Sequence, residues 1–220
     1  MEVTTRIPFH KELESLKKTV EDMSKLVLDV VRGSVRSLIN QDENFALQII
    51  KKGEEIDLLE FNIEHKCMEL LALYQPVASD LRTLVTIIKI IADLDRLADY
   101  SEDICQVTIH THHLKKVREL DKILLMHGKV DNIVRIALKA LIEGDPELAK
   151  TLSGLDDEVD ELFVKIIGEG IETMKEDPSS VQFTANLILV SKYLERMADH
   201  ACNIAGRTIY MVTGKRKKIH

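Results

Sequence analysis

Apolar residues recur every three to four positions along most of the chain, a spacing that buries one face of an α-helix. No stretch sustains the alternation of period two that is typical of a half-buried strand, so we expect no sheet. The pattern is interrupted near residues 40–42, Pro76, residues 144–146 and Pro178, which carry helix-ending or helix-starting residue types. With a further division between residues 112 and 116, it predicts six helices, at about residues 10–40, 43–74, 78–112, 116–143, 146–176 and 179–212.

Two of these helices have recognisable starting residues. Asp145 followed by Pro146 reads as an N-cap and a proline in the first helical position. At the third helix we expect Ser79 or Asp80 to provide the cap, with Arg82 exposed in the first turn.

The second half of the chain repeats the first. The segment DRLAD at 95–99 returns as ERMAD at 195–199, and EEIDLL at 54–59 returns as DEVDEL at 157–162. A fixed period of this kind indicates a duplicated supersecondary unit. We therefore predict an all-α fold made of two tandem three-helix bundles related by a pseudo-two-fold axis. The expected divisions are residues 1–113, residues 114–214 and a basic tail at 215–220.

Carboxylates are the candidate chemistry. On a helical wheel of the third helix, Asp95 and Asp99 continue the stripe of Leu81, Leu84, Val85, Ile88, Ile91 and Ala92. Asp93, Arg96 and Tyr100 share the opposite, solvent-facing arc. The sixth helix repeats the pattern, with Glu195 and Asp199 pointing inward and Arg196 and His200 outward.

The helix before each of these adds further acids. In the second repeat Asp156 and Asp160 lie in or beside the apolar stripe, whereas the first repeat has Gly53 and Asp57 at the equivalent positions. Inward carboxylates can be paired with arginine, can be half-exposed, or can bind a metal ion. No Arg or Lys shares the predicted inner arc, which favours metal, and all-oxygen ligands suit Mg, Mn, Fe or Zn.

Composition narrows the class of protein. The net charge of −7 argues against nucleic-acid binding, and the only basic cluster is in the tail. No apolar run is long enough to cross a membrane and the start lacks a signal-peptide core, so we expect a cytoplasmic protein. Cys67, Cys105 and Cys202 have no metal or redox spacing and are expected to be buried and reduced.

Several enzyme classes lack their motifs. None of the eight histidines has a glutamate three residues before it, which excludes the ligand pattern of ferritin-like di-iron oxidases. A glycine-rich phosphate loop, a Gly-x-Ser-x-Gly elbow and a His-Glu-x-x-His motif are also missing from the sequence. The sequence therefore does not read as an enzyme.

The chain resembles the PhoU family of phosphate-transport accessory proteins. The resemblance rests on the two motifs at 95–99 and 195–199, on the run YQPVASDLR at 74–82, and on the tandem three-helix layout. It implies iron or zinc bound by carboxylate-x-x-x-carboxylate motifs. Carried over by position, the implied ligands are Asp156, Asp160, Glu195 and Asp199 in the second repeat, and Asp57, Asp95 and Asp99 in the first.

The first of these sites is one acid short. Gly53 stands where the family has a carboxylate, and Asp103, one turn beyond Asp99, is the expected substitute. Because each carboxylate adds ligand capacity, we expect the second repeat to hold a cation more tightly.

The resemblance also implies partners. These are the ATPase subunit of a phosphate ABC transporter and a sensor histidine kinase, through which the protein would repress phosphate-starvation genes, and we expect a homodimer. A metal-free helical scaffold that acts only through protein contacts is the alternative, and a di-metal hydrolase or oxidase is a third class.

Overall fold

The computed structural model describes residues 3–117 and 120–219, with side chains from residue 7 onward. Every regular element in these ranges is helical. The elements are α1 (Val3–Asn40), α2 (Glu43–Tyr74), α3 (Ala78–Thr111), α4 (Leu120–Glu143), α5 (Pro146–Lys150), α6 (Asp157–Glu176), a 3-10 turn at Pro178–Ser180, and α7 (Val181–Thr213).

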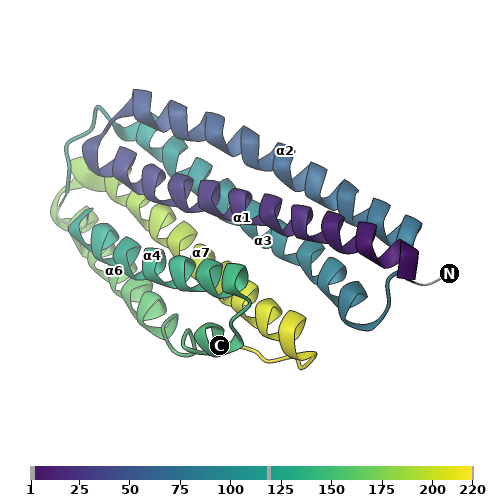
Figure 1. The fold of residues 1–220 in the computed structure, drawn as a ribbon. Helices are drawn as coiled ribbons and strands as arrows, with labels where there is room; N and C mark the ends of the chain where they lie inside the picture. Colours follow the sequence, from purple (N-terminus) through teal and green to yellow (C-terminus); the bar gives the residue numbers. More distant parts are fainter. Residues whose placement is uncertain (1–2, 118–119, 220) are drawn as a thin grey trace.

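The helices form two adjoining bundles (Figure 1). Helices α1, α2 and α3 run alongside one another in the first, while α4, α6 and α7 make up the second. The two bundles meet where α3 packs against α7 and α1 packs against α4. The predicted all-α fold of two tandem three-helix bundles is confirmed, and the predicted division at 113/114 falls between α3 and α4.

The core is built almost entirely from aliphatic side chains. Fully buried residues occur in both bundles and include Met23, Leu38, Ile56, Leu84 and Phe183. The three cysteines are buried and free, as predicted, and burial raises the pKa of each thiol to about 12. A thiol with so high a pKa is inert under ordinary conditions.

Aspartate caps begin two of the helices. The carboxylate of Asp42 accepts a hydrogen bond from the Phe45 N–H at 2.9 Å, which caps α2. Asp145 accepts from Glu147 and Leu148 at 2.9 and 3.0 Å, so the predicted cap before Pro146 is confirmed. Each such bond satisfies an N–H that the first helical turn leaves unpaired.

The predicted cap of α3 is wrong. The capping position is Val77, whose side chain cannot accept a hydrogen bond. Ser79 and Asp80 lie within the first turn of the helix, because the chain already turns into it at Ala78, where φ is 53°. Arg82 is only partly exposed, and its Nε donates to the Met211 carbonyl on α7 at 3.0 Å. This arginine therefore joins the two bundles.

The predicted helix at 146–176 is interrupted. It divides into α5 and α6, separated by turns at residues 151–156 that include Gly154 at φ +84°. Gly adopts this left-handed conformation without the steric cost that a side chain brings. The equivalent helix α2 runs unbroken through Gly53. As a result Asp156 lies just before α6 and not inside a helix.

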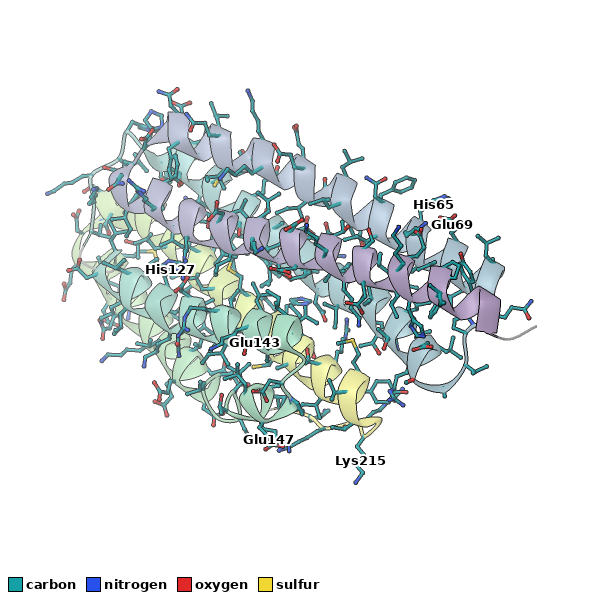
Figure 2. The ribbon with its side chains drawn as sticks, in the orientation of Figure 1. His65, Glu69, His127, Glu143, Glu147 and Lys215 are labelled. Atoms are coloured by element: carbon teal, nitrogen blue, oxygen red, sulfur yellow. The ribbon has the colours of Figure 1, made fainter. Side chains whose placement is uncertain are left out.

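The basic tail folds back onto the protein. After α7 the chain turns at Gly214, where φ is +73°, and Ile219 is only 1% exposed. Lys215 through Lys218 stay exposed, and Figure 2 places Lys215 just beyond the end of α7.

Candidate metal centre

The predicted ligands lie along two helix seams. The first seam, between α2 and α3, carries Asp57, Asp95, Asp99 and Asp103. The second seam, between α6 and α7, carries Asp156, Asp160, Glu195 and Asp199. Both pairs of helices pack against each other, so each seam draws its acids from two neighbouring helices.

The seams border the core and do not enter it. Asp95 and Asp99 are half-buried, and Val85 and Ala92, predicted to face inward, are exposed. The buried face of α3 is rotated from the predicted one; its members include Leu84, Ile87, Ile90, Leu94 and Leu97. The half-exposed alternative from the sequence is therefore correct for Asp95 and Asp99, while Asp156, at 8% exposed, is buried.

Crowding of like charges is strongest in the first seam. The pKa of Asp95 is raised to about 6, first by burial and then by the charges of Asp99, Glu60 and Asp57 in that order. The pKa of Glu60 is raised as well, by burial and then by Glu64, Asp57 and Asp99. These shifts show that α2 and α3 bring their carboxylates within electrostatic range of one another.

The second seam shows the same effect less strongly. Burial raises the pKa of Asp160, followed by the charges of Glu195, Asp199 and Asp156. The other three predicted ligands of the second repeat therefore lie within electrostatic range of Asp160.

Two acids of the first seam were missed by the sequence analysis. Glu60 is one of them. The other is Glu102, whose raised pKa is due to burial and to the nearby charges of Asp57 and Asp99. A Cβ built on Gly53 would lie 4.0 Å from Glu102 Oε2, so the glutamate side chain reaches over the glycine. Glu102 thus fills the place that Asp156 holds in the second repeat.

A signal for Glu102 was present in the sequence. Positions 95, 99 and 102 follow the i, i+4, i+7 spacing of one helical face. The counterpart of Glu102 one hundred positions later is the buried Cys202. The acid therefore stands at different positions in the two repeats. The first repeat has Gly53 and Glu102, whereas the second has Asp156 and Cys202 at the equivalent positions. The pKa of Asp103, the substitute expected from the sequence, is raised by burial and by the charge of Asp99.

Basic side chains compensate the second seam more than the first. Lys192 Nζ lies 2.7 Å from Glu195 Oε2, and Arg196 lies 3.1 Å from Asp199 Oδ2. In the first seam, Arg96 is 2.9 Å from Asp99 Oδ2. The predicted inner arc itself carries no Arg or Lys, but long side chains rooted on the solvent face reach these acids over one helical turn.

The donor chemistry suits a metal ion, although the side chains are not arranged around one. Carboxylate oxygens are ligands for hard and borderline cations, and an ion would relieve the repulsion seen in the raised pKa values. Within residues 3–117 and 120–219, no group of three or more His, Cys, Asp or Glu side chains is placed to hold an ion. Lys192 and Arg196 contact Oε2 of Glu195 and Oδ2 of Asp199, so an ion bound through these same oxygens would compete with them.

A buried polar cluster between the bundles was also missed. Asp93, predicted to face solvent, is 4% exposed, and one of its oxygens lies 3.0 Å from His200 Nδ1 on α7. Arg207 lies 2.5 Å from its other oxygen. The solvent-facing assignments of Asp93 and His200 are wrong because the wheel of one helix ignores α7, which covers that face of α3.

The comparisons with known proteins agree with this architecture. The family model described as PhoU domain matches twice, at residues 20–108 and 123–208, one match in each bundle. The fold therefore defines a tandem-repeat, all-helical protein with one PhoU domain in each bundle. The chain belongs to the PhoU family.

Relatives match along nearly the whole length. The phosphate-specific transport system accessory protein PhoU homolog of Clostridium acetobutylicum is 36% identical, covering 96% of this chain and 97% of the relative. PhoU homolog 1 of Thermotoga maritima is 33% identical, covering 96% of this chain and 92% of the relative. The crystal structure of PhoU from Pseudomonas aeruginosa superposes with a TM-score of 0.91 at 32% identity, covering 94% of this chain and all of that one.

A further solved structure is the phosphate transport system regulatory protein PhoU from Streptococcus pneumoniae. It is 26% identical, with a TM-score of 0.87, and covers 95% of this chain and 99% of that one. In the part of the chain that the structure describes, no helix is both long and apolar enough for a membrane span.

Proposed function

We propose that this protein is a regulatory adaptor of phosphate uptake and phosphate signalling, and not an enzyme. Membership of the PhoU family across both repeats carries this proposal, since relatives of nearly the same length are named as phosphate transport accessory proteins. In this role it would act in the cytoplasm, as a homodimer, between the ATPase subunit of a phosphate ABC transporter and a sensor histidine kinase. Its activity there would be to repress phosphate-starvation genes.

The adaptor would carry metal ions in its two seams. The ligands are Asp57, Asp95, Asp99 and Asp103, joined by Glu60 and Glu102, in the first, and Asp156, Asp160, Glu195 and Asp199 in the second. The proposal is supported by two observations: each seam collects acids from neighbouring helical segments, and the charges of these acids raise the pKa of Asp95 in the first seam and of Asp160 in the second. Iron or zinc is the first choice and Mg or Mn the second. A bound ion would cross-link the two helices of a seam and so couple metal occupancy to stability.

The alternative function is a metal-free helical scaffold. It is favoured by the ion pairs of Lys192 and Arg196, which already compensate two acids of the second seam. Elemental analysis of the protein purified without a metal-affinity tag separates the two candidates. A preparation that stays metal-free after incubation with iron and zinc supports the scaffold.

Regulation itself is tested by complementation. Deleting the gene from its host is expected to raise a phosphate-starvation reporter at high phosphate to the level normally seen in starvation. Restoring the full-length gene should return the reporter to its repressed level. A reporter that stays repressed after deletion would contradict the regulatory role.

The exchange of acids between the repeats gives a direct test of the first seam. Glu102→Ala is expected to weaken metal binding there by about tenfold to a hundredfold, because a carboxylate is lost from the ligand set. Adding Gly53→Asp to that variant should restore binding, since the freed space over Gly53 then holds an acid placed like Asp156.

Both measurements are made in an Asp199→Asn background, so that the second seam contributes little metal. Binding is followed by titration with Zn²⁺ or Mn²⁺ after dialysis against a chelator. The single variant Gly53→Asp is the control for a general effect of added charge. If Glu102→Ala binds metal as well as its parent, Glu102 is not a ligand.

A further inference from the structure

A basic pocket lies between α3, the C-terminal half of α7 and the C-terminal tail. Its volume is about 520 Å³. Its lining includes five basic residues, namely Lys89, Arg207, Arg216, Lys217 and Lys218. Neither the family comparison nor the metal proposal uses this pocket.

The tail that closes the pocket is held in place. Ile219 is inserted into the protein with 1% of its surface exposed. The Lys217 carbonyl passes so close to α7 that a Cβ on Gly206 would lie 3.0 Å from it. The Arg216 guanidinium lies over the Tyr210 ring, 5.8 Å from its centre. The basic residues of the tail are therefore fixed along one wall and do not form a free extension.

The pocket concentrates positive charge on a protein whose net charge is −7. No Asp or Glu lines it. The Arg207 guanidinium forms an ion pair with the Asp93 carboxylate at 2.5 Å. Within the part of the chain that the structure describes, Lys89, Arg216, Lys217 and Lys218 form no ion pair with a carboxylate. Four like charges held around one cavity repel one another unless an anion is bound.

We propose that this pocket binds a small phosphate-bearing anion with several negative charges, such as a polyphosphate or a phosphate ester. Lysine ammonium groups and the planar guanidinium of Arg216 match phosphate oxygens in charge and geometry. The cavity admits a ligand larger than a single phosphate ion, and Val85 and Ile219 supply apolar walls for an organic part. The inference stands independently of the metal seams.

Binding is tested by calorimetric titration of the full chain with orthophosphate, pyrophosphate and ATP. We expect saturable binding of pyrophosphate or ATP that weakens as salt is raised, because the contacts are ionic. Lys89→Gln and the double variant Arg216→Gln/Lys218→Gln should each weaken it by about tenfold or more. The matched control Lys51→Gln/Lys165→Gln removes two exposed lysines elsewhere and should leave the affinity unchanged.

Trypsin gives a second readout, since it cleaves after Lys and Arg. The bound anion should slow cleavage at residues 215–218 in the parent protein. Lys89→Gln keeps every cleavage site of the tail and should lose this protection. Equal protection of parent and Lys89→Gln would mean that the anion inhibits the protease and does not occupy the pocket.

Vesicles containing phosphatidylglycerol distinguish a lipid headgroup from a free anion. Pocket-dependent binding of the soluble anions supports the proposal. Three outcomes overturn it: no saturable binding of the soluble anions, binding that the pocket variants leave unchanged, and binding to the vesicles alone.

Discussion

Asp95→Asn is expected to stabilise the metal-free protein near neutral pH and to destabilise the metal-loaded protein. Without metal, the ionised Asp95 carboxylate is disfavoured by burial and by the charges of Asp99, Glu60 and Asp57. Asparagine removes that repulsion, and because the side chain is half-exposed the gain is on the order of 1 kcal/mol. With metal, the same substitution removes a ligand and should lower affinity by about tenfold or more.

The metal-free effect depends on pH in a defined direction. Burial and its neighbours raise the pKa of Asp95 from 3.8 to about 6, so the folded protein takes up a proton more readily than the unfolded chain. The stabilisation that this group contributes is therefore fully present below pH 3.8 and is lost as the pH rises through about 6. The Asn variant should match its parent in acid and exceed it at neutral pH.

Urea unfolding in the presence of a chelator, repeated with added Zn²⁺, measures both effects. In the chelator arm Glu195→Gln is the comparison, because Glu195 already has Lys192 as an ionic partner and its loss should bring a smaller gain. An Asp95 variant that is less stable than its parent without metal would contradict the crowding of charges in the first seam.

Asp93→Asn is expected to destabilise the protein by about 2–3 kcal/mol, the largest effect of any polar substitution proposed for this chain. The substitution keeps the size of the side chain and an acceptor for His200, but leaves the Arg207 charge without its carboxylate. Arg207 is 32% exposed, so water offsets part of the loss that a fully buried pair would show.

Tyr193→Phe tests the equivalent place in the other repeat, and should change stability by less than about 0.5 kcal/mol. A double variant, Asp93→Asn with Arg207→Met, should recover part of the loss, because the unpaired charge is then removed as well. If Asp93→Asn is as stable as its parent, the ion pair adds nothing to the joining of the bundles.

The fold was largely predictable because its signals are local. Helical periodicity and the cap at Asp145 depend on neighbours in sequence. The repeat at 95–99 and 195–199 is recognised by comparing two short segments of the sequence. The missed break between α5 and α6 depends on the left-handed conformation of Gly154, and glycine is also tolerated inside helices, as Gly53 shows. The presence of glycine therefore could not tell a helix break, as at Gly154, from a continuous helix, as at Gly53.

The seams were predicted in part, since carboxylates one turn apart on an apolar stripe mark a helix margin. Their surroundings could not be read from single helices. Arg196 and Lys192 reach the acids from another arc, and Glu102 is defined by the space over Gly53 on a neighbouring helix. Asp93 was misplaced for the same reason, because its burial depends on α7, more than one hundred residues away in the chain.

The contact between α3 and α7 differs on its two sides. Asp93 and His200 meet on one side, and at the positions related to them by the repeat, the Tyr100 and Tyr193 rings stack with centres 6.0 Å apart. In a symmetric homodimer of single repeats, one sequence must serve both sides of such a contact, so the interface is self-complementary. Covalent linkage of the repeats removes that constraint. The junction is therefore a pseudo-symmetric contact within one chain, in which Asp93 and Tyr193 stand at equivalent positions with different chemistry, and the Tyr100 ring also contacts the His200 ring, with centres 5.8 Å apart.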